Sequence, residues 1–155
     1  FKEQCQPTLD INFRGTVDFT ERMLPLLRRA AVEGQDARLV NVASMSGRLN
    51  QVTDQAKVDR LTSPDLTMPE LMELVDGFQA SVLEGTHKEA GWGNSNYGMS
   101  KLAVIAATKI WARQEQIVRI SVNCCCPGYC RRTCQVKTEP GIRRMVPRML
   151  LFRPP

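Results

Sequence analysis

At 155 residues the chain has the length of one domain, and its hydrophobic content of 43% is enough to form a buried core. It contains no apolar run of about 18 residues or more, so no membrane-spanning helix is predicted. The net charge of +5 arises in residues 131–155, and the near-neutral remainder argues against a nucleic-acid-binding protein.

Residues 7–31 have the apolar spacing of a helix, which Thr8 could cap and Pro25 could end or kink. The expected apolar stripe consists of Ile11, Val17, Phe19, Met23, Leu24 and Leu27. Asn12 lies beside this stripe, where its amide must find hydrogen-bond partners. Without a functional role, Asn12 would face solvent or make a local hydrogen bond.

A short strand is predicted over residues 37–43, ARLVNVA, because this stretch is rich in β-branched residues and is bounded by turn residues. Ser44 follows the strand directly. Open α/β sheets bind ligands beyond the carboxyl ends of their strands, so Ser44 is a candidate ligand contact. The alternative is a serine that only caps a helix or stabilises a turn.

The long segment that follows contains one clear helix over residues 68–83, where the apolar positions recur at helical spacing. Thr67 and Glu70 have the capping-box pattern at its start. A loop is predicted over residues 84–93. It carries His87, the single histidine of the chain, which is expected to be a surface residue and is assigned no role.

The central helix is predicted over residues 94–111, NSNYGMSKLAVIAATKIW. Its mostly apolar circumference indicates a helix that is buried on two sides. Tyr97 and Lys101 are about one turn apart and therefore share a face. An ammonium group beside a phenol favours the phenolate form that acid–base chemistry uses. By itself the pair is a weak indication, because such pairs more often only pack together.

A second strand is predicted over residues 118–126, VRISVNCCC, and it ends at Pro127 and Gly128. Strand, helix and strand in this order predict a parallel sheet with a right-handed crossover. Ser44, Pro127 and Gly128 should then share one sheet edge with the start of the helix that carries Tyr97 and Lys101. The residues alone thus predict a ligand crevice with a hydroxyl, a phenol and an ammonium group.

Five of the six cysteines fall within residues 124–134. The spacing of Cys126, Cys130 and Cys134 would allow a metal site, but Pro127 and Gly128 interrupt any helix that would align them. No metal is therefore predicted, and reduced thiols on a buried strand are the favoured interpretation. Unpaired thiols together with the absence of a targeting segment predict a cytoplasmic location.

Three motifs in this order resemble the active-site motifs of the short-chain dehydrogenases/reductases: NVASMSG at 41–47, YGMSK at 97–101 and NCCCPG at 123–128. Asn12, in DINFRGT, matches the fourth catalytic position of that family. The long separation of Ser44 from Tyr97 is similar to that of the monomeric carbonyl reductases. The resemblance covers residues 1 to about 131. It implies a Rossmann-like, doubly wound parallel α/β sheet, a helical insert at about 50–92, and a monomer.

The resemblance implies an enzyme that uses NADPH to reduce small carbonyl compounds, such as ketones, aldehydes or quinones, to alcohols. Tyr97 would be the general acid, Lys101 would hold the nicotinamide ribose, and Ser44 would hydrogen-bond the carbonyl oxygen. Asn12 would support a water that relays protons to Lys101. The implied contacts to NADPH or NADP+ are Tyr97, Lys101, Pro127, Gly128, Cys130 and Arg131.

The chain departs from the family pattern at both ends. It has neither the TGxxxGxG phosphate loop nor the NNAG motif, so we expect an incomplete sheet whose N-terminal βαβ units lie upstream of Phe1. One edge of strand 37–43 should then be exposed, and NADPH should bind weakly or not at all.

Beyond the last strand the pattern is lost, with Arg132 where the family has Thr. Residues 132–155 are expected to form an irregular basic tail, and a shifted reading frame is one hypothesis for its origin. The alternative to an enzyme is a non-catalytic Rossmann remnant with a binding or regulatory role.

Overall fold

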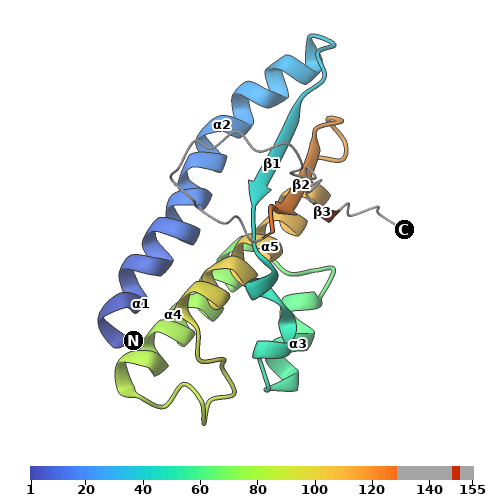
Figure 1. The fold of residues 1–155 in the computed structure, drawn as a ribbon. Coiled ribbons are helices and arrows are strands. Elements are labelled where there is room, and N and C mark those ends of the chain that lie inside the picture. The colour runs from blue at the N-terminus through green and yellow to red at the C-terminus, as the bar shows by residue number, and fades with distance from the viewer. Residues whose placement is uncertain (129–147, 151–155) are drawn as a thin grey trace, which may run out of the picture.

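The computed structural model describes residues 1–128 and 148–150, which form a layer of helices against one face of a small sheet (Figure 1). Helix α1 (Lys2–Leu9), the π-helical turn η1 (Asp10–Arg14) and α2 (Gly15–Val32) follow one another as one long rod. After β1 (Arg38–Val42) come two 3₁₀ turns, η2 (Met45–Gly47) and η3 (Leu49–Gln51). The remaining elements are α3 (Gln55–Thr62), α4 (Met68–Glu84), α5 (Asn96–Gln114), β2 (Ser121–Cys126) and β3 (Arg148–Leu150).

The sheet has the order β1-β2-β3, with β1 at one edge. β1 and β2 are parallel, in a register that runs from Arg38 opposite Ser121 to Val42 opposite Cys125. β3 pairs antiparallel with β2. The predicted α/β class and parallel strand pair are therefore confirmed. Within 132–155, the range expected to be an irregular tail, only the β3 residues are described.

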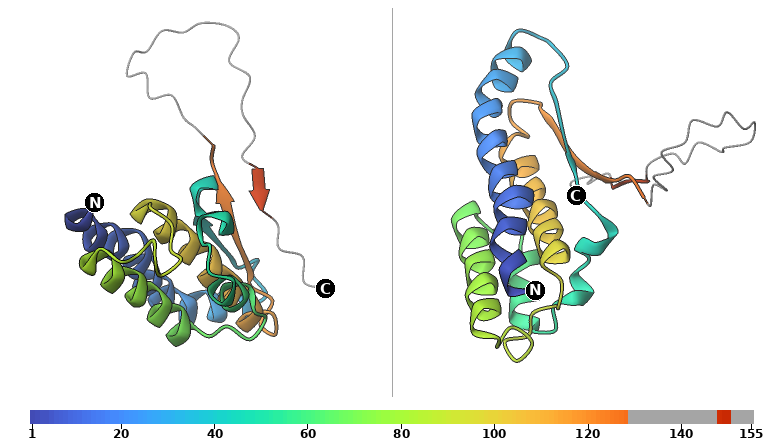
Figure 2. Two further views of the ribbon diagram at one scale, coloured as in Figure 1. Left: turned by 90° about the horizontal axis from the view of Figure 1, so that it is seen from below. Right: turned by 60° about the vertical axis from the view of Figure 1, so that its left-hand side comes forward.

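Helix α5 is the centre of the fold and packs against α1, α4, η2 and both parallel strands (Figure 2). Its fully buried side chains include Trp111, Met99 and Ile110. The prediction of a helix buried on two sides is confirmed. The strands turn alternate side chains toward it, so that Asn41 and Cys124 are buried while Val40 and Val42 are 50% and 57% exposed on the opposite face.

The predicted start of the first helix at residue 7, with Thr8 as its cap, is wrong. The helix begins at Lys2, and Pro7 lies inside it. Burial of Cys5 and Leu9, both 0% exposed, stabilises these turns despite the proline. Pro25 likewise lies inside α2 without ending it.

Two residues of the expected apolar stripe, Ile11 and Phe19, are 74% and 63% exposed, so their assignment to the core is wrong. The buried positions of the rod are instead Cys5, Leu9, Phe13, Val17, Thr20 and Leu24. The first four of these recur every fourth residue, which drifts around a straight α-helix. The wider π turn keeps them on one face, and this turn was not predicted.

The insert contains α4, whose predicted capping box between Thr67 and Glu70 is confirmed. It also contains α3, which was not predicted. The expectation that His87 is a surface residue is wrong, because it is only 8% exposed. Its Nε2 lies 2.9 Å from Asn94 Oδ1, and the Phe1 ring packs against it at a centroid distance of 5.0 Å. The loop therefore folds back onto the start of the rod.

Candidate active site

The carboxyl ends of β1 and β2 lie side by side, as the parallel register requires. Beyond the paired residues, the Ala43 N–H donates to the Cys125 carbonyl at 2.8 Å, and the Met45 N–H donates to Cys126 Sγ at 3.2 Å. These bonds hold the chain beyond β1 against the end of β2. Ser44, Pro127 and Gly128 consequently all lie at this one edge of the sheet.

Ser44 is half-buried in extended backbone conformation, with φ −152° and ψ 153°. Its Oγ accepts a hydrogen bond from the Ser46 N–H at 3.1 Å and caps η2. The capping role considered from the sequence is thus real. It does not consume the hydroxyl proton, which Ser44 can still donate to a ligand oxygen.

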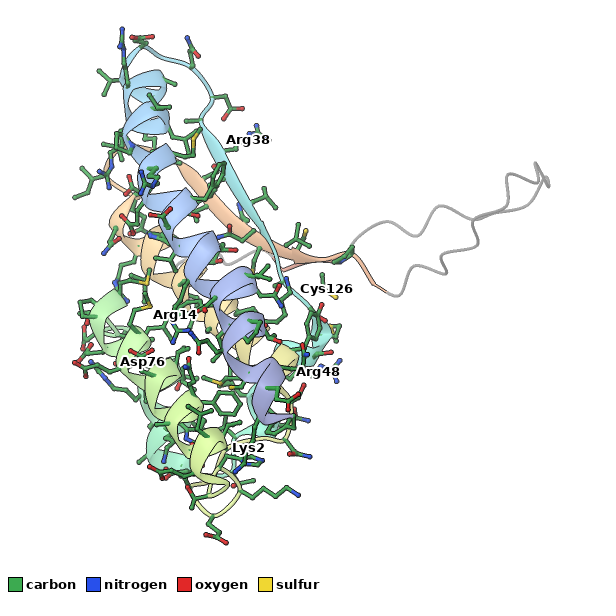
Figure 3. The ribbon with its side chains drawn as sticks, turned by 90° about the vertical axis from the view of Figure 1, so that its left-hand side faces the viewer. Lys2, Arg14, Arg38, Arg48, Asp76 and Cys126 are labelled. Carbon is green, nitrogen blue, oxygen red and sulfur yellow. The ribbon has the colours of Figure 1, made fainter. Side chains whose placement is uncertain are left out.

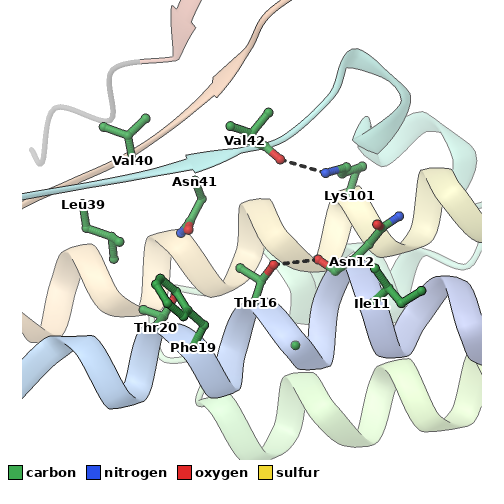
Figure 4. Close-up of a pocket in the computed structure, with 11 residues that line it drawn as sticks. Ile11, Asn12, Thr16, Phe19, Thr20, Leu39, Val40, Asn41, Val42 and Lys101 are labelled. Atoms are coloured by element: carbon green, nitrogen blue, oxygen red, sulfur yellow. Dashed lines mark hydrogen bonds between the residues drawn. The ribbon is translucent and has the colours of Figure 1, made fainter.

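Tyr97 and Lys101 lie one turn apart near the start of α5, where Ser95 Oγ caps the helix by accepting from the Gly98 N–H at 2.9 Å. The Tyr97 side chain is 46% exposed, and Lys101 Nζ lies 5.8 Å from the centre of its ring. Lys101 Nζ also donates to the Val42 carbonyl at 2.8 Å (Figure 4). The ammonium group is therefore fixed between the phenol and the end of β1.

Asn12 lies in the middle of the π turn and is half-buried. Its Nδ2 donates to Ser100 Oγ at 3.2 Å, and Ser100 Oγ donates to the Tyr97 carbonyl at 2.8 Å. A short chain of hydrogen bonds thus joins Asn12 to the turn of α5 that carries Tyr97 and Lys101.

An open groove of about 600 Å³ runs between η1, α2 and the free edge of β1. Figure 4 shows Asn12 and Lys101 on its two walls. Ser44 belongs to a separate, mostly apolar pocket of about 270 Å³ between η2, α3 and α5. The structure therefore brings Asn12 and Lys101 into one cavity. Tyr97 contacts Lys101 through its ring and Asn12 through Ser100, whereas Ser44 lies in the separate pocket beyond the end of β1.

Of the remaining predicted contacts, Pro127 and Gly128 are exposed. Gly128 has a φ of 80°, and no heavy atom of the described, non-adjacent residues lies within 4 Å of where a Cβ would be. Cys130 and Arg131 lie outside the described residues, as do Cys130 and Cys134 of the possible metal set.

The four cysteines within the described ranges are free thiols. No helix in that part of the chain is long and apolar enough to cross a membrane.

Two residues of the site were missed from the sequence. Ser100 is 0% exposed, and its Oγ accepts a hydrogen bond from the Asn12 amide. A polar residue on the buried side of the central helix was the signal that could have indicated it. Gly47 allows η2 to pack directly on α5, because a Cβ there would be 2.7 Å from the backbone of Lys101 and Leu102. The Ser-Gly pair after the strand was the available indication.

No family model matches the chain. It is 35% identical to carbonyl reductase (NADPH) 1 of Mus musculus over 136 residues, and 32% identical to that of Sus scrofa over 137 residues. Both alignments cover 84% of the chain, but 47% and 45% of these proteins. The chain thus spans about half the length of the curated relatives that it matches.

Several solved structures are similar to this one. Salutaridine reductase from Papaver somniferum superposes with a TM-score of 0.71 and 29% sequence identity, over 83% of this chain and 42% of that chain. Menthone neomenthol reductase from Mentha piperita gives a TM-score of 0.71 and 27% identity, over 82% and 43%.

Proposed function

Since the chain is a homologue of carbonyl reductases in the short-chain dehydrogenase/reductase family, we propose that it carries the catalytic residues of an NADPH-dependent carbonyl reductase. A reductase function is supported at the level of the family by the relatives. The observation that carries the finer proposal is the Lys101 ammonium group held between the Val42 carbonyl and the accessible Tyr97 ring. The proposed substrates are small ketones, aldehydes or quinones.

Tyr97 is the proposed general acid, because its phenol can reach a ligand at the sheet edge and donate a proton to the alkoxide that forms on reduction. Lys101 is proposed to stabilise the phenolate left behind. One of its three protons is used by Val42, which leaves two for ribose hydroxyls or water. Ser44 is proposed to donate its hydroxyl proton to the carbonyl oxygen and so stabilise the charge that develops there.

Asn12 is proposed to hold a water that returns protons to Lys101. Both residues line the groove beside β1, which is open to solvent. The Asn12 Nδ2 is engaged by Ser100, so the amide oxygen is the group that would accept from such a water.

The residues of the described part fit the nicotinamide–ribose end of the cofactor. Lys101 would hold the ribose, and Pro127 and Gly128 would lie against the nicotinamide, where Gly128 leaves room for a close approach. NADPH, when bound, supplies the hydride. We keep Cys130 and Arg131 as proposed contacts. A Gly-rich phosphate loop is not present in the sequence, so the proposal for this chain covers the catalytic end only.

The remaining proposals follow from the same relationship. Residues 1–131 are proposed as part of a Rossmann-fold reductase domain with its insert at about 50–92, and residues 132–155 as a separate basic tail. For a domain that has its full sheet, the packing of α4 on α1 and α5 supports a monomer, since it covers a helix face that could otherwise pair with a second copy. The free thiols support a reducing compartment such as the cytoplasm.

The test is a chimera in which residues 1–128 replace the matching segment of the mouse carbonyl reductase, which then supplies the rest of the fold. Tyr97→Phe should lower kcat/KM for NADPH-dependent reduction of a quinone by about 10²–10⁴-fold, because it removes only the proton donor. Arg22→Met, which breaks an exposed ion pair with Asp18 on α2, is the control and should leave the activity unchanged. Undiminished NADPH consumption by the Tyr97→Phe chimera would show the mechanism to be mistaken.

The second candidate function is a non-catalytic Rossmann remnant, which the missing phosphate loop favours for the 155-residue chain. Calorimetric titration of this chain with NADPH separates the two. Binding that Lys101→Met abolishes would support an enzyme, whereas no binding by the chain and no activity of the chimera would support the remnant.

A further inference from the structure

The π turn η1 is the least regular part of the long rod and carries Asn12 at its centre. π turns are rare in proteins and occur often at functional sites. Within this stretch the Asn12 carbonyl accepts a hydrogen bond from Thr16 Oγ1 at 3.0 Å. The backbone of the turn sets the direction of the Cα–Cβ bond of Asn12, so the direction of its side chain depends on the turn keeping its shape.

Arg14 closes the π turn on its outer side. Its Nη1 donates to Asp10 Oδ1 at 2.6 Å, so one ion pair connects the first and the last residue of the turn. Its Nη2 donates to two acceptors on α4, Asp76 Oδ1 at 2.5 Å and Gln79 Oε1 at 2.9 Å. Figure 3 shows Arg14 and Asp76 side by side between the rod and α4.

The network differs from an ordinary surface ion pair. An isolated exposed pair contributes little, because solvent screens it and its side chains lose freedom. The Arg14 side chain is only 26% exposed and binds three acceptors from two elements. The guanidinium group is planar and rigid, so satisfying several acceptors at once fixes their relative positions.

We propose that Arg14 is a positioning residue, which fixes the π turn against the insert helix α4 and thereby directs the Asn12 amide to Ser100 beside Tyr97 and Lys101. The catalytic consequence rests on the proposed function. The geometric part does not, because it concerns contacts within this chain alone. The insert thus supports the site from behind, through the clamp formed by Arg14, Asp10, Asp76 and Gln79.

The decisive variant is the double substitution Asp76→Ala/Gln79→Ala, which removes both acceptors on α4. Asp76 is exposed, and alanine is favourable in a helix, so the fold should be retained. In the 155-residue chain, hydrogen exchange of the Asn12 side-chain amide, assigned by its loss in Asn12→Asp, should become faster by about fivefold or more. Glu73→Ala, an exposed change on the same helix, should not alter this rate.

Arg14→Met should reproduce the faster exchange, and Arg14→Lys should restore part of the protection because Lys can reach one acceptor. An Asn12 amide that exchanges at the wild-type rate in Asp76→Ala/Gln79→Ala would overturn the proposal. If Arg14→Met does not fold, the exchange rate in Asp76→Ala/Gln79→Ala still tests the proposal.

In the chimera, the double variant should lower kcat by about tenfold with little change in KM, since it displaces a group needed only for proton transfer. Faster exchange without a change in kcat would leave the clamp in place but remove Asn12 from the mechanism. An inactive chimera with a protected Asn12 amide in the wild-type chain would count against the proposed function and not against the clamp.

Discussion

At the scale of single residues, the candidate site contains side chains that each make two contacts. Ser100 accepts from Asn12 and donates to the Tyr97 carbonyl, and Lys101 reaches Val42 while lying over the Tyr97 ring. Tyr97, Lys101, Ser44 and Asn12 could be selected from the sequence because motif and spacing mark them. Arg14 could not, because its partners Asp76 and Gln79 lie on α4, far away in the sequence.

The cysteines also show what burial does to a single group. Cys124 is 0% exposed, and its burial, reinforced by the neighbouring Cys125 thiol, raises its pKa to about 11. The unfolded chain releases this proton near the ordinary value of 9.0, whereas the folded chain keeps it to about 11. Raising the pH across this range therefore favours unfolding.

We predict that Cys124 reacts slowly with iodoacetamide in the folded chain. At pH 8 a thiol with a pKa near 11 is only about 0.1% thiolate, compared with about 9% for a cysteine with the ordinary pKa of 9.0. Mass spectrometry should show a rate at Cys124 that keeps rising with pH above 9. In urea all cysteines should react alike. A Cys124 rate that already levels off near pH 9 in the folded chain would contradict the raised pKa.

At the scale of elements, α5 is held to the rod at both ends. Near the site the contact is Asn12 with Ser100, and at the far end Arg28 donates to Glu115 in two hydrogen bonds of 2.9 and 2.5 Å. Glu115 is 1% exposed, and among the residues that the structure describes its carboxylate is paired with Arg28. Between them Trp111 Nε1 donates to Glu21 Oε1 at 2.7 Å. These contacts keep the Tyr97 turn beside the Asn12 turn.

The packing of η2 on α5 leads to an element-scale prediction for Gly47→Ala. The added Cβ would lie 2.7 Å from the α5 backbone, so η2 must move and carry Ser44 with it. We expect a loss of about 1–3 kcal/mol in the free energy of unfolding, measured by urea denaturation.

The matched control is Gly77→Ala on α4, where a Cβ meets nothing within 4 Å. It should raise the free energy of unfolding by about 0.5–1 kcal/mol, because alanine is the better helix former. Equal stabilities of the two variants would show that η2 does not pack on α5 as described.

At the scale of the whole molecule, the helical layer covers only one face of the parallel pair within the described residues. β1 is an edge strand, as expected from the sequence, and Val40 and Val42 remain exposed beside the groove. Free strand edges with apolar side chains pair readily with other chains. The chain spans about half the length of its curated relatives.

We predict that the 155-residue chain self-associates through β1. Val40→Lys should shift sedimentation velocity profiles toward the monomer, because a charge beside the free edge opposes pairing. Val32→Lys is the control, since Val32 is 80% exposed and lies at the end of α2, not on a strand. The chimera should be monomeric, since the relative's segments supply the neighbouring strand that the resemblance implies. Identical association of both lysine variants would locate the contact elsewhere.

The sequence by itself determined the strands around Val40 and Cys124, the capped helix α4 and the central helix. It also singled out, by motif, the four candidate residues Asn12, Ser44, Tyr97 and Lys101. These follow from local periodicity, turn residues and fixed spacing, which act within a few positions of the chain. Only the tertiary structure decided the π turn, the start of α1 at Lys2, the burial of His87 and the partners of Arg14 and Ser100. Those features depend on which distant surfaces pack together, because the free energy of burial there exceeds the local preferences of residues such as Pro7.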